Sequence, residues 1–123
     1  MAGDYILIVD DSQTSARFLE SALEVEGYSV RVCPNAMAAL AIAARTPVAL
    51  ALLDLRLPDM PGAELARLLR EMPHLSATPM IGVTAGDRPE EAAQARASGM
   101  SDVLQKPIST ASLRRLVASL TQH

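Results

Sequence analysis

The stretch VALALLD, Val48 to Asp54, places a carboxylate directly after six consecutive apolar residues. A continuous apolar run of this length is typical of a parallel strand that is covered on both faces. A second apolar run, Tyr5 to Val9, is followed directly by Asp10 and Asp11. Both runs therefore predict buried strands with acidic side chains at their carboxyl ends.

Helical and strand patterns alternate along the whole chain. The predicted strands cover residues 5–9, 28–32, 48–53, 79–83 and 102–105, and the predicted helices cover residues 13–26, 36–45, 63–71, 88–98 and 110–120. Ser12, Asn35 and Ser109 are placed to cap helices, and Asp87 with Glu90 resembles a capping box. Parallel neighbours need crossover connections, so this alternation predicts a parallel sheet with helices on both faces.

Reactive side chains follow four of the five predicted strands. They are Asp10 and Asp11, Asp54, Thr84 and Lys106. Ligands of such folds bind outside the carboxyl ends of the strands. Carboxylates ~4 Å apart repel by about 4 kcal/mol per pair at an effective dielectric of ~20, so a cation is expected among them. Oxygen ligands suit Mg²⁺, and the set as a whole suits phosphoryl chemistry with a carboxylate nucleophile.

Composition narrows the class of protein. A chain of 123 residues, half of them hydrophobic, suits one domain with a packed core. The net charge of −3 argues against a nucleic-acid surface, and no apolar run approaches the ~20 residues that span a membrane. The single cysteine, Cys33, and the lack of an apolar signal segment favour a reducing, cytoplasmic setting.

The segments IVDDS, LLDLRLPDMPG, GVTA and ASGMSDVLQKP, with the spacing between them, resemble the receiver domains of two-component response regulators over essentially all of residues 1–123. The resemblance implies a flavodoxin-like α/β fold: a doubly wound, five-stranded parallel sheet in the order 2-1-3-4-5, with five helices. It implies a phosphoprotein switch in signal transduction or a phosphorelay. Beyond its own phosphorylation and dephosphorylation, the domain would not be an enzyme.

The same resemblance assigns the site residues. Asp54 would accept a phosphoryl group from a histidine kinase or a histidine phosphotransfer protein. Asp10, Asp11, Asp54 and the backbone carbonyl of Arg56 would bind Mg²⁺. Thr84 would bond the phosphoryl group as the switch hydroxyl. Lys106 would contact that group too, with a cis bond to Pro107.

Three positions modify the family pattern. An aromatic residue usually lies three positions before the lysine, whereas this chain has Val103, which cannot bury or expose a ring. Either the switch is muted or rerouted on the face of the fourth helix, fifth strand and fifth helix, or backbone motion carries the signal. Arg56 either covers the phosphoryl group or is solvated, and Gly86 offers no side chain to orient water. We expect slow self-dephosphorylation.

Two other functions stay open on the residues alone. One is a Mg²⁺-dependent phosphohydrolase with an aspartyl nucleophile, although such enzymes place an acid two residues after the nucleophile, where this chain has Arg56 and Ser12. The other is a flavin-binding electron carrier, which scarce aromatics oppose. No effector domain is recognisable. The chain is expected to be a stand-alone receiver or one from a longer regulator or hybrid kinase, at its N-terminus as the Met1 start suggests. It could form homodimers through the face described above.

Overall fold

A single parallel sheet organises the molecule. The computed structural model describes residues 4–121. Its strands lie in the order β2-β1-β3-β4-β5, which confirms the predicted topology. The strands are β1 (Tyr5–Val9), β2 (Val30–Cys33), β3 (Val48–Asp54), β4 (Met80–Thr84) and β5 (Asp102–Gln105). The order reverses between β1 and β3, so the carboxyl ends of these two strands lie side by side at the switch point.

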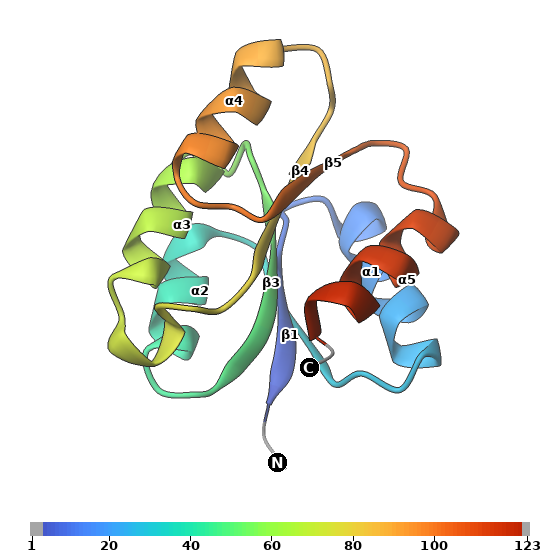
Figure 1. The fold of residues 1–123 in the computed structure, drawn as a ribbon, viewed down its shortest axis with the longest axis horizontal. Coiled ribbons are helices and arrows are strands. Elements are labelled where there is room, and N and C mark those ends of the chain that lie inside the picture. Colours follow the sequence, from blue (N-terminus) through green and yellow to red (C-terminus); the bar gives the residue numbers. More distant parts are fainter. Residues whose placement is uncertain (1–3, 122–123) are drawn as a thin grey trace.

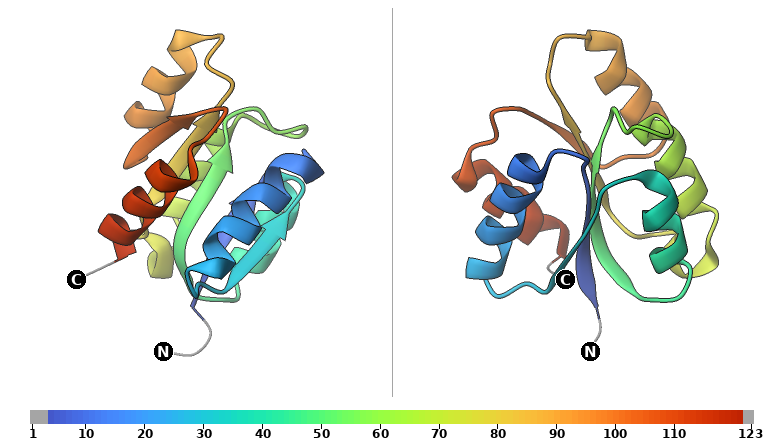
Figure 2. Two further views of the ribbon diagram at one scale, coloured as in Figure 1. Left: turned by 90° about the vertical axis from the view of Figure 1, so that its right-hand side faces the viewer. Right: turned by 180° about the vertical axis from the view of Figure 1, so that it is seen from behind.

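Helices cover both faces of the sheet. They are α1 (Gln13–Val25), α2 (Ala36–Ala43), α3 (Gly62–Arg70), α4 (Pro89–Ala97) and α5 (Thr110–Thr121), with a short 3₁₀ helix η1 (Pro73–Leu75) that the sequence pattern did not predict. Figure 1 shows α2, α3 and α4 on one side of the sheet and α1 and α5 on the other; Figure 2 shows the same layers from two further directions. Within residues 4–121, no helix combines the length and the apolar character needed to cross a membrane.

The central strands are buried on both faces. Leu7 and Val9 of β1 pack in the core layer beneath α2 and α3. Ile6 and Ile8 of the same strand pack in the opposite layer, with α1 and α5. Because successive side chains alternate across a strand, a strand between two helix layers has no polar face. Charge can therefore enter only where the strand ends, which is where the aspartates lie.

Three predicted helix caps are present, and the predicted capping box is not. The Ser12 hydroxyl accepts the Ser15 amide (3.3 Å), and the Asn35 side chain accepts the Ala38 amide (2.8 Å). The Ser109 hydroxyl accepts the Ser112 amide at 3.2 Å. The capping box at Asp87 is absent, because α4 has its N-cap at Arg88 without a side-chain hydrogen bond. The Asp87 carboxylate instead binds the Arg56 guanidinium.

The second strand begins later than the predicted residue 28. The Tyr28 amide donates to the Leu23 carbonyl at the end of α1 (3.2 Å), next to Gly27 at φ +96°. This left-handed turn is a common helix ending. Since the Tyr28 amide closes the helix, the pairing of β1 with β2 starts at Val30.

Candidate functional site

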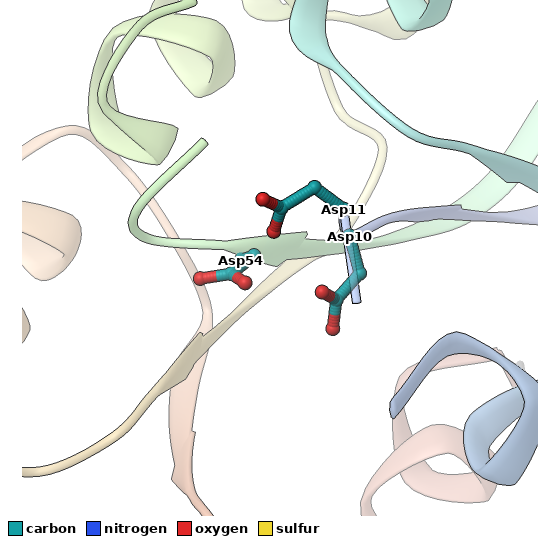
Figure 3. Close-up of side chains that lie close together, drawn as sticks. All are labelled: Asp10, Asp11 and Asp54. Atoms are coloured by element: carbon teal, nitrogen blue, oxygen red, sulfur yellow. The ribbon is translucent and has the colours of Figure 1, made fainter. Parts of the chain in front are cut away.

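Three carboxylates converge at the carboxyl edge of the sheet. Asp10 and Asp11 follow β1, and Asp54 is the last residue of β3, the neighbouring strand. One oxygen from each carboxylate lies within 4.8 Å of the other two (Figure 3). Asp10 is buried, Asp54 is partly buried and Asp11 is exposed. The sequence prediction that these three acids share one site is thus matched by their positions.

The inner oxygen of Asp10 lacks a hydrogen bond. Asp10 Oδ1 accepts the Ser12 amide at 2.9 Å, but the buried Oδ2 has no hydrogen-bond partner within residues 4–121. A buried carboxylate oxygen without a partner is costly. A divalent cation held by oxygen ligands would satisfy it, and the three carboxylates supply such ligands. The residues present therefore fit a Mg²⁺ ion.

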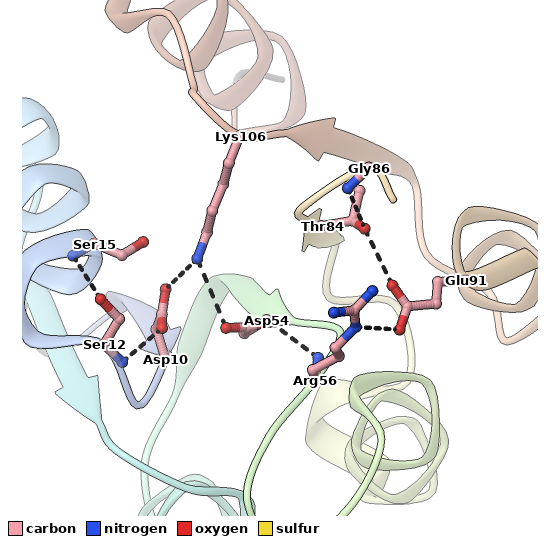
Figure 4. Close-up of polar contacts among 9 residues, drawn as sticks. All are labelled: Asp10, Ser12, Ser15, Asp54, Arg56, Thr84, Gly86, Glu91 and Lys106. Carbon is pink, nitrogen blue, oxygen red and sulfur yellow. Dashed lines mark hydrogen bonds and ion pairs between the residues drawn. The ribbon is translucent and has the colours of Figure 1, made fainter. Parts of the chain in front are cut away.

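Lys106 lies opposite these acids. Its Nζ is 3.5 Å from Asp10 Oδ2 and 3.8 Å from Asp54 Oδ2 (Figure 4). The Lys106 amide donates to the Thr84 carbonyl at 2.8 Å, which fixes the loop after β5 against the end of β4. The Lys106–Pro107 bond is cis, as expected. The ammonium partly balances the negative charge of the acids.

Burial and charge change the acidity of Asp54. Burial raises the pKa of its carboxyl to about 6, the Arg56 amide opposes the rise by donating to Oδ1 at 2.9 Å, and the neighbouring Asp10 charge adds to it. Desolvation and a like charge both disfavour the ionised form. A cation bound between the carboxylates would favour ionisation, which a nucleophilic carboxylate requires.

A close backbone approach positions the loop after Asp54. A Cβ on Gly62, the first residue of α3, would lie 2.3 Å from the Asp54 carbonyl oxygen and 2.8 Å from Leu55 Cα. Only glycine lets α3 begin directly against the strand end. Asp59 also fixes this loop, because its carboxylate accepts the Ala36 and Met37 amides of α2 at 3.0 and 2.9 Å. Nothing in the local sequence pattern predicted this role of Asp59.

Thr84 ends β4 with its hydroxyl directed at α4. Thr84 Oγ1 accepts the Gly86 amide at 3.1 Å and donates to Glu91 Oε1 at 3.3 Å. Gly86 has φ +85°, and a Cβ there would meet the Gln105 side chain at 2.3 Å. Figure 4 shows the hydroxyl and the Glu91 carboxylate facing each other.

Arg56 extends from the same loop toward α4. Its Nε donates to Glu91 Oε2 at 2.7 Å, and its Nη2 binds the Asp87 carboxylate. These two acids raise the pKa of the guanidinium. The sequence pattern predicted neither acid as a partner of Arg56. A signal was present all the same, because three acids (Asp87, Glu90 and Glu91) follow Thr84 closely.

Val103 occupies the position where the family pattern has an aromatic ring. It is half-buried against the core layer that α2 and α3 cover, and it pairs with Gly82 of β4. Its branched side chain has little rotamer freedom. The effect of this valine on switching stays a prediction.

Comparisons with known proteins agree with this geometry. The family model described as "Response regulator receiver domain" matches residues 6–118. An uncharacterized 14.6 kDa protein of Leptolyngbya boryana is 40% identical over 91% of this chain and 86% of its own. The response regulator PleD of Caulobacter vibrioides is 38% identical over 95% of this chain, which spans only 26% of that protein.

One of the similar solved structures contains a metal ion. The receiver domain of the sensor histidine kinase PA1611 from Pseudomonas aeruginosa superposes with a TM-score of 0.89, at 29% identity and 98% coverage of both chains. That structure has a magnesium ion coordinated in its active-site cleft. Together with the match over residues 6–118, the fold and the acidic edge lead to one conclusion. The chain belongs to the response regulator receiver domain family, which accepts phosphoryl groups in two-component signalling.

Proposed function

We propose that Asp54 is the phosphoacceptor of this receiver domain and that Asp10, Asp11, Asp54 and the Arg56 backbone carbonyl hold a Mg²⁺ ion. The observation that carries the proposal is the convergence of three carboxylates around a buried oxygen without a hydrogen bond, opposite a single lysine. A bound Mg²⁺ would neutralise charge on the phosphoryl oxygens. Titration with Mg²⁺, followed through the amide resonances of Asp11 and Arg56, tests the metal site independently of phosphorylation.

In the transfer step, a carboxylate oxygen of Asp54 forms a bond to phosphorus. The bond between phosphorus and the donor's histidine nitrogen breaks, and the nitrogen keeps the electron pair. The product is an acyl phosphate on Asp54. Lys106 would bind one phosphoryl oxygen, and the Thr84 hydroxyl would donate to another, which would supply positive charge and a hydrogen-bond donor where negative charge develops.

We propose further that residues 1–123 act as one receiver domain, with a histidine kinase or a histidine phosphotransfer protein as phosphodonor. All the side chains that the chemistry needs come from this chain, so a small phosphodonor should also load Asp54 and water should slowly remove the phosphoryl group. A protein that receives phosphoryl groups from a histidine kinase is expected in the cytoplasm.

The α4–β5–α5 face is the candidate homodimer surface, since α4 buries only Ala95 fully. The net charge of −3 supports the absence of direct nucleic-acid binding.

Incubation with acetyl phosphate and Mg²⁺, read as intact mass, tests the proposal. The wild type should gain the mass of one phosphoryl group, and Asp54→Asn should gain none. Asp4→Asn is the matched control, because Asp4 is exposed and precedes β1. A wild type that stays unlabelled, or that turns over a generic phosphate ester without a labelled intermediate, would refute the proposal.

A further inference from the structure

One carboxylate joins the two groups that flank the proposed phosphoryl site. Glu91 accepts the Thr84 hydroxyl on Oε1 (3.3 Å) and Arg56 Nε on Oε2 (2.7 Å). Figure 4 shows the Glu91 carboxylate joined to both residues by dashed lines. The loop after β3, the end of β4 and the first turn of α4 are thereby tied together through a single side chain.

The position of the first turn of α4 depends strongly on Glu91, because this turn has little other buried packing. Ala95 is the one fully buried residue of α4, and residues 85–90 are all exposed. The Glu91 side chain itself is only 14% exposed, against 40% for Arg56. Exposed ion pairs contribute little stability, but a largely buried carboxylate that loses its partners pays a desolvation penalty. The first turn of α4 therefore depends on Glu91 keeping its partners.

We propose that Glu91 is a positioning residue that holds Thr84 and Arg56 in the resting arrangement, and that phosphorylation of Asp54 releases both from it. The inference rests on the proposed function, because it requires a phosphoryl group on Asp54. A threonine hydroxyl has one proton to donate. Thr84 therefore cannot donate to Glu91 and to a phosphoryl oxygen at the same time.

Electrostatic attraction to the phosphoryl group releases Arg56 from Glu91. A phosphoryl group carries a charge of about −1.5 to −2 at neutral pH, so an aspartyl phosphate replaces the single negative charge of the Asp54 carboxylate with a larger one close to Arg56. That charge competes with Glu91 and Asp87 for the guanidinium. Glu91 then loses both partners, and the first turn of α4 moves to return the carboxylate to water. This route carries the signal to α4 without a ring at position 103, where this chain has Val103.

Beryllofluoride, a mimic of the phosphoryl group, tests the release in the whole chain by ¹⁵N NMR. In the wild type, saturation with beryllofluoride and Mg²⁺ should shift the Arg56 Nε–H resonance and the amides of the first α4 turn. Glu91→Gln keeps an acceptor for Thr84 but removes the charge that holds Arg56. Because less must be broken on activation, its beryllofluoride affinity should rise about fivefold, at the low end of typical coupling between sites.

Glu90→Gln is the matched control, since it removes the same charge from the same helical turn but at an exposed position. Its affinity should stay within about twofold of wild type on the same scale. A purely structural role for Glu91 would lower the melting temperature and leave the affinity unchanged. An unmoved Arg56 Nε–H resonance in beryllofluoride-saturated wild type overturns the inference without any variant. Wild type that binds no beryllofluoride overturns the proposed function itself.

Discussion

Lys106 Nζ lies 3.5 Å from Asp10 Oδ2, the buried oxygen that has no hydrogen bond within the described residues 4–121. The ammonium thus stabilises the carboxylates when no metal ion is bound. It also competes with a metal ion for the same negative charge. Two opposing effects follow for any variant that removes it.

Lys106→Met should lower the melting temperature of the metal-free protein, because Asp10 and Asp54 lose their shared counter-charge. It should also bind Mg²⁺ several-fold more tightly, because the competing positive charge is gone. Calorimetric titration with Mg²⁺ measures the second effect. Arg115→Met is the control, since Arg115 is an exposed cation of α5. Weaker Mg²⁺ binding in Lys106→Met would contradict the assigned site.

Stability should depend on pH through Asp54. Its carboxyl has a pKa of about 6 in the folded protein, against an ordinary value of 3.8. Between these values the folded state binds more protons than the unfolded state, so the free energy of unfolding falls as pH rises. We expect a fall of about 2 kcal/mol, less than full linkage because the carboxyl is partly solvated.

Urea unfolding in EDTA at pH 4 to 7 measures this dependence. Asp54→Asn cannot ionise, so it should lack this part of the pH dependence and be more stable than wild type at pH 7. The difference between the two proteins should shrink toward pH 4. A difference that is constant across this range would show that the Asp54 pKa is not raised.

Gly86→Ala should destabilise the end of β4. A left-handed backbone costs alanine roughly 1–2 kcal/mol, and its Cβ would also collide with Gln105. Gly27→Ala is the control, because Gly27 has φ +96° but nothing within 4 Å of its Cβ. The excess loss in Gly86→Ala should disappear when Gln105→Ala is added. If Gly86→Ala and Gly27→Ala lose equal stability in thermal unfolding, the Gln105 side chain moves aside without cost and the prediction is wrong.

The lifetime of the phosphoryl group should depend on Arg56. Once released from Glu91, the guanidinium is close enough in sequence to Asp54 to cover the acyl phosphate, while Gly86 gives water no side chain to bind. Arg56→Ala should therefore dephosphorylate several-fold faster, since an exposed acyl phosphate meets water directly. Decay of the labelled mass after removal of the phosphodonor gives the half-life. A longer half-life in Arg56→Ala refutes the shielding role.

The fold and the clustering of the three acids were predictable for a common reason. Runs such as Val48–Leu53 have no polar face, so they require a covered parallel strand, and parallel strands bring their carboxyl ends to one edge. Strand order and the side chains after each strand then place Asp10, Asp54 and Lys106 together. Local sequence was sufficient because each of these residues is fixed by the end of its own strand.

The contacts of α4 were not predictable in this way. Arg56 and Glu91 are 35 residues apart, and their bond depends on the rotamer of a long side chain and on where α4 begins. The local pattern favoured Asp87 as a helix cap, but pairing with Arg56 took its carboxylate instead. The late start of β2 has a similar origin, because the Tyr28 amide closes α1. In both cases two partners competed for one polar group, the Asp87 carboxylate or the Tyr28 amide, and the local sequence did not show which partner would bind it.

Borohydride reduction of the phosphorylated protein tests the central claim most directly. The reagent reduces an aspartyl phosphate to homoserine, and peptide mass mapping then identifies the residue. After treatment with acetyl phosphate and Mg²⁺, homoserine should appear at position 54 and be lost when Mg²⁺ is withheld. Homoserine at position 10 or 11, or none in the labelled protein, would contradict the assignment of Asp54 as the phosphoacceptor.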